Sequence, residues 1–204
     1  MRLLVATTNR HKLREIRGIL ADLDLEIDGL DAYPSVDEPE ETGHTFAENA
    51  CQKALYYSKR LGVVAVAEDS GLEIDGLGGE PGVHSARYGG ANAAAYPQKF
   101  ALIYGRLRER RALGSPARFV CALAAADGAS ILYETRGTIE GRIADAPSGH
   151  GGFGYDPIFF YPLLGRTLAE LDENEKARIS HRGLAFGQLR AHLLAHPLGS
   201  RPRP

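Results

Sequence analysis

The sequence predicts an α/β fold with a mixed β-sheet, and the order of its elements leads to that prediction. The first part of the chain alternates short apolar segments of strand length with segments of helical periodicity. Residues 117–162 are instead a run of strand-like segments that lies between helices. At 204 residues the chain is long enough to bury one substantial hydrophobic core.

The first half begins with a buried strand at Leu3–Ala6, followed by an amphipathic helix and a second strand at residues 24–30. A second helix covers residues 45–62, where Gly62 ends it, and an unbroken apolar run at 63–67 predicts a strand buried on both faces. The apolar positions of the first helix are Leu13, Ile16, Ile19 and Leu20, and those of the second are Ala47, Ala50, Cys51, Ala54, Leu55, Ser58 and Leu61.

The second half starts with a glycine-rich region at residues 71–90 and an amphipathic helix around 94–111. Strands are predicted at 117–127, 130–144 and 156–162, with a hairpin turn at 127–130 between the first two. A last helix covers residues 184–194. We expect residues 1–196 to form a single domain and residues 197–204 to be a flexible tail.

Charge and cysteine content narrow the class of protein. The net charge is −2, so a large basic face for nucleic acid or an anionic membrane is not expected, and a local cluster of Lys and Arg must hold any anionic ligand. Cys51 and Cys121 are expected to be reduced core thiols in a cytoplasmic protein. The sequence has no apolar run of membrane-spanning length, so secretion and membrane insertion are not expected.

The junction between the first strand and the first helix is a candidate anion site. Thr7, Thr8 and Asn9 form this junction, and Lys12 falls in the first turn of the helix. Unpaired backbone N–H groups at a helix N-terminus favour an anion, and Lys12 is placed to reach the same anion. The alternative is that Thr8 or Asn9 is a helix N-cap with no ligand.

Carboxylates form a second candidate site. Glu68 and Asp69 follow the apolar run at 63–67, and an acidic loop carries Glu38, Glu40 and Glu41. Mg²⁺ takes one or two protein carboxylates and completes its shell with water and phosphate oxygens. The alternative, a solvated acidic face, is expected for most of these residues. It is weakest for Asp69, which is predicted where a buried strand opens to solvent.

A glycine-rich loop precedes the strand at 156–162. Its spacing, "GHGGFG", matches G-x-G-x-x-G, but a dinucleotide-binding loop needs a strand before it and a helix after it, so we reject that interpretation. Phe153 and Tyr155 beside Asp156 are suited to hold a purine by stacking and by a hydrogen bond to the base edge. The alternative is that these rings are buried and pack against the loop.

The start of the last helix carries cations that its dipole disfavours. Ser180 is a candidate N-cap, His181 and Arg182 follow it, and Lys176 lies just before. We therefore expect contacts with a ligand to compensate for the unfavourable interaction of these cations with the helix dipole.

The motifs together resemble one enzyme family. "TTNRHK", "EETGHTFAENACQKA", "AEDSGLEIDGLGGEPGVHSARYGG", "GFGYDPIF" and "SHRGLAF" are similar to the successive signatures of the inosine triphosphate pyrophosphatases, also named noncanonical purine NTP pyrophosphatases. The resemblance covers nearly the whole chain. It implies Mg²⁺-dependent hydrolysis of ITP, dITP and XTP to the monophosphate and pyrophosphate, which clears deaminated purines from the nucleotide pool. It also implies a cytoplasmic homodimer with a strongly twisted mixed sheet flanked by helices, in two lobes with the active site in the cleft between them.

The resemblance also implies roles for individual residues. Asp69 would be the general base and, with Glu40, a ligand of Mg²⁺. Glu40 is preferred to Glu41 because it lies three residues before Gly43, as in the family pattern. The residues implied to bind the substrate are Thr7, Thr8, Asn9, Arg10, His11, Lys12, Lys53, Ser70, Phe153, Gly154, Tyr155, Asp156, Lys176, His181 and Arg182.

These residues support one hypothesis for the chemistry. Lys12, Lys53 and Lys176 neutralise the triphosphate while water attacks the α-phosphorus. Asp69 either accepts the proton of that water or ligates a metal that lowers the pKa of the water. A buried donor such as Arg182 or a loop amide pairs with O6 of the base and rejects adenine. The alternatives are a nucleotide sensor without turnover, and a pyrophosphatase acting on modified pyrimidine triphosphates.

Overall fold

The computed structural model describes residues 2–90 and 95–197. Residues 198–204 of the predicted tail and Ala94, the predicted start of the third helix, lie outside the described residues. The strands are β1 (Arg2–Val5), β2 (Glu26–Gly29), β3 (Ala65–Ile74), β4 (Pro116–Asp127), β5 (Ser130–Ile143), β6 (Phe159–Tyr161) and β7 (Arg166–Thr167). The α-helices are α1 (Arg10–Ile19), α2 (Phe46–Leu61), α3 (Tyr96–Glu109), α4 (Glu173–Ile179) and α5 (His181–Ala195).

The sheet is mixed, which confirms the predicted fold class. Its seven strands are hydrogen-bonded in the order β2-β1-β3-β4-β5-β6-β7. β1 pairs in parallel with β2 and β3, whereas β6 pairs antiparallel with β5 and β7. The predicted hairpin between β4 and β5 turns at Gly128 and Ala129, and Gly128 supplies a positive φ of 60°.

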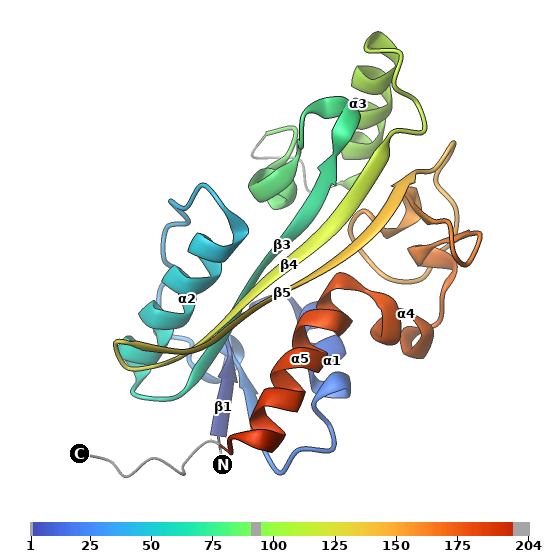
Figure 1. The fold of residues 1–204 in the computed structure, drawn as a ribbon. Helices are drawn as coiled ribbons and strands as arrows, with labels where there is room; N and C mark the ends of the chain where they lie inside the picture. The colour runs from blue at the N-terminus through green and yellow to red at the C-terminus, as the bar shows by residue number, and fades with distance from the viewer. Residues whose placement is uncertain (1, 91–94, 198–204) are drawn as a thin grey trace. The chain divides into compact units, whose positions relative to one another are not determined.

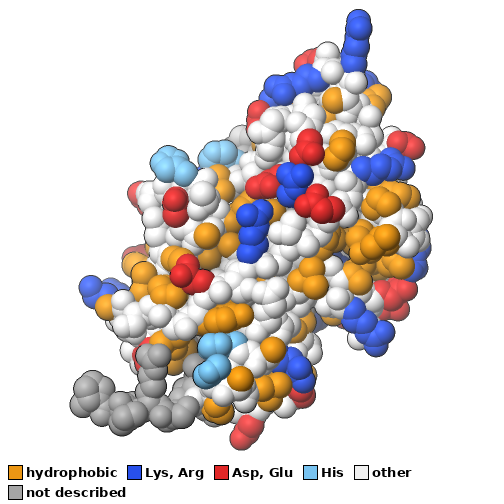
Figure 2. Space-filling model, in the orientation of Figure 1, with side chains coloured by type: hydrophobic (Ala, Val, Ile, Leu, Met, Phe, Trp, Pro, Cys, Tyr) orange, Lys and Arg blue, Asp and Glu red, His pale blue; other side chains and the backbone are white. Residues whose placement is uncertain are grey.

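The chain divides into two compact units. Unit 1 contains residues 1–69, 121–137 and 181–204, and unit 2 contains residues 70–120 and 138–180. Among the described residues, no helix has both the length and the apolar content that a membrane span requires. On the face drawn in Figure 2, Lys and Arg side chains are interspersed with Asp and Glu side chains.

The core of unit 1 lies between the strands and two neighbouring helices. α1 and α5 lie side by side (Figure 1) and bury one face of β1, β3 and β4. Each fully buried Leu or Ile in such a layer stabilises the fold by about 1.5–3 kcal/mol. The layer consists mainly of Leu3, Val5, Leu13, Ile16, Leu20, Val66, Cys121, Leu123, Ala185, Phe186 and Leu189.

The other face of these strands has small side chains. Side chains alternate between the faces of a strand, so Ala65 and Ala67 lie opposite Val66, and Ala122 and Ala124 lie opposite Cys121 and Leu123. Figure 1 shows α2 on this side, away from α1 and α5. α2 begins at the N-cap Thr45 and ends at Gly62, which has a φ of 67°, as predicted.

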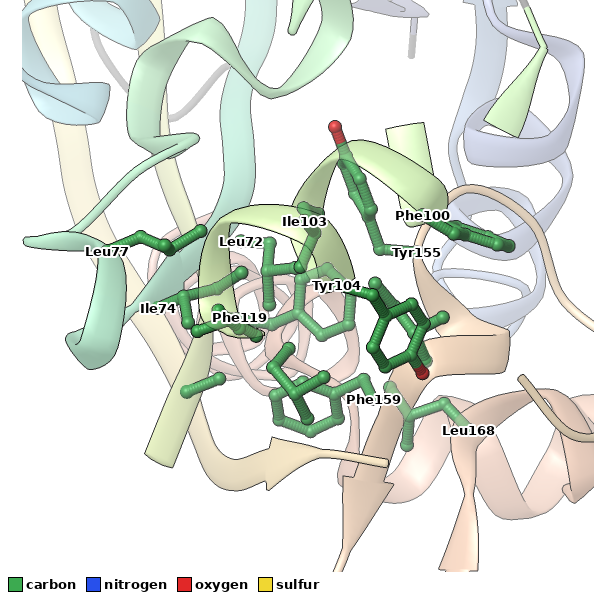
Figure 3. Close-up of a cluster of buried hydrophobic side chains, with 14 of the residues drawn as sticks. Leu72, Ile74, Leu77, Phe100, Ile103, Tyr104, Phe119, Tyr155, Phe159 and Leu168 are labelled. Atoms are coloured by element: carbon green, nitrogen blue, oxygen red, sulfur yellow. The ribbon is translucent and has the colours of Figure 1, made fainter. Parts of the chain in front are cut away.

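Unit 2 has its own apolar core. α3 packs onto the distal parts of β3, β4 and β5 and onto β6, and Figure 3 shows Leu72, Ile103, Phe119 and Phe159 pointing toward one another. The rings of Phe119 and Phe159 lie 4.7 Å apart between centroids. Tyr155 is part of this core, with 3% of its surface exposed.

Two predictions about the elements are wrong, and two elements were not predicted. β3 does not end at Ala67 but continues to Ile74, because charges from other segments compensate the carboxylates inside it. The buried face of α2 does not include Ala47, which is exposed; Phe46, Asn49 and Tyr57 are buried in addition to Ala50, Ala54 and Ser58. The sequence interpretation also missed α4 and β7, which lie between predicted elements.

Candidate active site

The loop between β1 and α1 is closed by its own side chains. Asn9 Oδ1 accepts hydrogen bonds from the backbone N–H groups of His11 (2.9 Å) and Lys12 (3.3 Å). Thr7 Oγ1 accepts from the backbone N–H of Asn9 at 3.2 Å. Asn9 is therefore the N-cap of α1, and its side chain occupies the backbone N–H groups of His11 and Lys12. Any anion bound at this loop would be reached by the ammonium group of Lys12 rather than by its backbone N–H. Thr8, Arg10 and His11 are exposed on this loop and the first turn.

β3 directs two adjacent carboxylates to opposite faces of the sheet in unit 1. Glu68 has the same parity as Val66 and points toward α1 and α5, where it meets Lys12 and Arg182. Asp69 has the opposite parity and points toward α2, where it meets Asn49 and Lys53. The two neighbours in sequence therefore belong to two different clusters.

The Glu68 cluster is a buried ion network. Glu68 Oε1 accepts from Lys12 Nζ at 2.9 Å and from Arg182 Nη2 at 3.0 Å. Its Oε2 accepts from the thiol of Cys121 at 2.9 Å, and Arg182 Nη1 donates to Glu15 at 2.8 Å. Burial opposes ionisation of Glu68, but the charges of Arg182 and Lys12 outweigh it and hold the pKa of Glu68 well below its usual range.

The Asp69 cluster combines a carboxylate, an amide and an ammonium group. Asp69 is 8% exposed, and its Oδ2 accepts from Asn49 Nδ2 at 2.9 Å. Lys53 Nζ lies 3.5 Å from Asp69 Oδ1 and 2.9 Å from Glu41 Oε1. Burial raises the pKa of Asp69, although Lys53 and the Asn49 hydrogen bond partly oppose the rise. A buried carboxylate with a raised pKa is typical of a general base.

The chemistry of this cluster fits a hard divalent cation. Glu41 and Asp69 present carboxylate oxygens to the same ammonium group, and oxygen ligands of this kind suit Mg²⁺. Glu40, the predicted second ligand, is exposed, whereas its alternative Glu41 contacts Lys53. In the described part of the chain, no group of three or more His, Cys, Asp or Glu side chains is arranged to hold a metal ion.

In unit 2, the loop before β6 is held by a second buried ion pair. Lys176 Nζ lies 2.6 Å from Asp156 Oδ2, and both side chains are at most 5% exposed. The same oxygen accepts from the backbone N–H of Phe153 at 2.7 Å. A Cβ atom at Gly152, which has a φ of 66°, would lie 2.2 Å from Asp156 Oδ2, so this position requires glycine. Lys176 Nζ lies 4.5 Å from the ring centroid of Phe153.

The two aromatic residues of this loop, Phe153 and Tyr155, differ in burial. The Tyr155 hydroxyl donates to the Ser85 carbonyl at 2.8 Å, and its ring packs edge-on against Tyr96. Tyr155 therefore follows the buried-aromatic alternative, whereas Phe153 is partly exposed. Lys99 is buried as well and donates to the Ala86 carbonyl at 2.6 Å and the Ser85 carbonyl at 3.3 Å.

The predicted site residues fall into these groups. Unit 1 contains Thr7–Lys12, Glu40, Lys53, Asp69, His181 and Arg182, and unit 2 contains Ser70, Phe153–Asp156 and Lys176. The structure brings Lys53 to Asp69 and Lys176 to Asp156. His181 and Arg182 are buried at the start of α5, and the charge of Arg182 is balanced by Glu68 and Glu15. These two carboxylates therefore account for a buried cation at the start of α5 without a contact between Arg182 and a base.

Several residues of the clusters were absent from the predicted site. Asn49 lies four residues before Lys53, so the two polar side chains fall on one face of α2. This spacing in the sequence is a signal that could have identified Asn49. Glu41 is the alternative to Glu40 as the second metal ligand. No local pattern links Cys121 to Glu68 or Glu15 to Arg182, because these contacts join residues 53 and 167 positions apart.

Comparison with known proteins places the chain in one family. Residues 3–192 match the model of the Ham1 family. A dITP/XTP pyrophosphatase from Exiguobacterium sp. is 44% identical over 194 residues, which are 95% of this chain and 97% of that protein. A dITP/XTP pyrophosphatase from Thermus thermophilus is 46% identical over 205 residues, 100% of this chain and 95% of that protein. A solved structure of a HAM1 protein from Coxiella burnetii superposes with a TM-score of 0.88 at 40% identity, covering 96% of this chain and 99% of that one. The chain is a member of the Ham1 family.

Proposed function

We propose that this protein hydrolyses ITP, dITP and XTP to the nucleoside monophosphate and pyrophosphate. The observation that carries the proposal is the buried Asp69, held between Asn49 and Lys53 in a family whose curated members include dITP/XTP pyrophosphatases. The reaction adds water across the α–β phosphoanhydride bond, so the α-phosphoryl group gains the hydroxyl oxygen and pyrophosphate leaves.

The residues of unit 1 act on the triphosphate and the water. Lys12 and Lys53 supply positive charge to phosphate oxygens, which reduces repulsion of the attacking water. Asp69, whose buried carboxylate is oriented by Asn49 Nδ2 and Lys53 Nζ, accepts the proton of that water. A divalent cation, for which we propose Mg²⁺ held by Asp69 and by Glu40 or Glu41, would neutralise phosphate charge and lower the pKa of the water. In the free protein the ammonium group of Lys53 is shared by Glu41 and Asp69.

The residues of unit 2 act on the nucleoside. Phe153, which is partly exposed, stacks on the base, and the Asp156–Lys176 pair fixes the backbone around it. Hypoxanthine and xanthine present an acceptor at position 6 and a donor at N1, and adenine presents the reverse. Backbone groups of the 153–156 loop that pair with the first pattern would face a mismatch with ATP, and each buried unpaired group costs about 1–3 kcal/mol.

The remaining elements of the proposal concern the protein's state in the cell. We propose that it is a cytoplasmic homodimer whose partner in the reaction is a purine nucleoside triphosphate. The position of the active site relative to the two lobes, and the end of the domain at residue 196, stay predictions.

The test is pyrophosphate release with Mg²⁺ from ITP, dITP, XTP, ATP, GTP and dTTP, compared between the wild type and Asp69→Asn. Release from the first three substrates that is lost in the variant supports the proposal. Binding of ITP without release favours a nucleotide sensor, and preference for dTTP favours a pyrimidine substrate. Release of orthophosphate in place of pyrophosphate would place the attack on another phosphorus.

A further inference from the structure

We propose that Asn49 is a positioning residue that fixes the carboxylate of Asp69 and ties the acidic loop to it. The inference rests on the proposed function, because Asp69 is taken as the proton acceptor of that reaction. It adds a residue that acts through Asp69 and the loop, without touching the substrate itself.

The orientation of the Asn49 amide is determined by its two partners. Asn49 is 1% exposed; its Oδ1 accepts from the backbone N–H of Gly43 at 2.8 Å, and its Nδ2 donates to Asp69 Oδ2 at 2.9 Å. A backbone N–H can only donate, so the amide oxygen must face Gly43. The amide NH₂ group must then face Asp69, and it stabilises the ionised form of that carboxylate.

The contact with Gly43 is too close for a side chain at position 43. A Cβ atom there would lie 2.5 Å from Asn49 Oδ1 and 2.8 Å from the Cβ of Glu48. Glycine therefore lets the backbone of the loop reach the amide. Because Gly43 follows Glu41 by two residues, the same contact restrains the segment that brings Glu41 to Lys53.

α2 holds Asp69 through two residues one turn apart. Asn49 binds Oδ2 of Asp69, and Lys53, four residues later, lies 3.5 Å from Oδ1. With both oxygens contacted by one helix, rotation of the carboxylate about its Cβ–Cγ bond is restricted. The water that attacks phosphorus must meet this carboxylate in one geometry, and an error of about 1 Å in such a contact can slow a reaction by about 100-fold.

The experiment compares three variants with the wild type. Asn49→Leu removes both hydrogen bonds at nearly constant volume. Asn49→Asp keeps an acceptor for Gly43 but removes the donor to Asp69, and Gly43→Ala displaces the amide without changing it. The matched control is Gln52→Leu, which removes an exposed amide on the same helix that contacts Thr42 of the same loop but has no contact with Asp69.

We expect kcat for dITP to fall about 10- to 100-fold in Asn49→Leu, Asn49→Asp and Gly43→Ala, with KM changed by less than about threefold. The affinity for inorganic tripolyphosphate, measured by calorimetry without turnover, should stay at the wild-type value, because Lys12 and Lys53 are intact. Gln52→Leu should keep the wild-type kcat. A global structural defect would instead weaken tripolyphosphate binding along with kcat.

Wild-type kcat in Asn49→Asp would overturn the proposal, since the donor to Asp69 would then be dispensable. If Asn49→Leu does not fold, Asn49→Asp and Gly43→Ala still decide the question. A wild-type protein without activity on ITP, dITP and XTP would refute the proposed function instead, so the two failures are distinguishable.

Discussion

Replacement of Glu68 by glutamine should markedly lower the melting temperature Tm of the protein. Glu68 is buried, and its carboxylate compensates both Lys12 and Arg182. Removing one partner of a buried ion pair costs about 3–5 kcal/mol, because the remaining charge is left without compensation. Arg182 keeps Glu15 as a partner, so we expect a loss near the lower value, about 3 kcal/mol.

This loss corresponds to a large shift in thermal unfolding. For a protein of this size, 1 kcal/mol shifts Tm by about 2–4 °C, so Glu68→Gln should lower Tm by about 6–12 °C at pH 7. The control is Glu26→Gln, which removes the exposed ion pair with Arg2 and should leave Tm unchanged within error. Circular dichroism melting measures both variants.

The pH dependence provides an independent check. The pKa of folded Glu68 lies well below its usual value, so its stabilising effect is complete above the unfolded-state pKa of about 4.3. It is lost as the pH falls through the lower, folded-state pKa. The difference in Tm between the wild type and Glu68→Gln should therefore be constant from pH 6 to 8 and shrink below about pH 4. A difference that is absent at pH 7, or that grows on acidification, would refute the reasoning.

The remaining predictions concern the proposed substrate contacts. Lys53→Met should lower kcat/KM for dITP at least 100-fold by removing the cation that Glu41 and Asp69 share, and a variant within tenfold of the wild type would contradict this. Gly152→Ala should raise KM for ITP more than tenfold while tripolyphosphate affinity stays constant, because a Cβ atom would collide with Asp156; Gly165→Ala, at another positive φ with open space, is its control. Lys99→Met should destabilise unit 2 by about 1–3 kcal/mol in urea unfolding, since the Ser85 and Ala86 carbonyls lose a donor, and an unchanged midpoint would argue against the contact.

Helix ends depend on residues that are neighbours in the sequence, so local patterns can predict them. Gly62 has the backbone freedom that a helix end requires and ends α2 as predicted, and Asn9 caps α1, which was the alternative to an anion site. α4 was missed although a local signal exists: Asp172 and Glu175 form a capping box, in which each side chain binds the backbone N–H of the other residue. A short helix between two motifs was therefore predictable from this spacing.

The interior of β3 was not predictable in the same way. Two adjacent carboxylates after an apolar run are typical of a strand end, because an uncompensated buried charge is unfavourable. The compensating cations Lys12, Lys53 and Arg182 come from three helices, and Arg182 is 114 residues from Glu68. Hydrophobic periodicity carries no information about such pairs. The choice between Glu40 and Glu41 likewise depends on how the acidic loop meets Lys53.

The opposite directions of Glu68 and Asp69 make β3 intolerant of a shift by one residue. A deletion or insertion within residues 65–67 that slides the strand along its neighbours would turn Glu68 toward α2 and Asp69 toward α1 and α5. The proposed base would then enter the ion network of the core, and the core carboxylate would take its place beside Lys53. Homologues of this chain should therefore vary in the length of the loops around β3 but keep the count of residues within it.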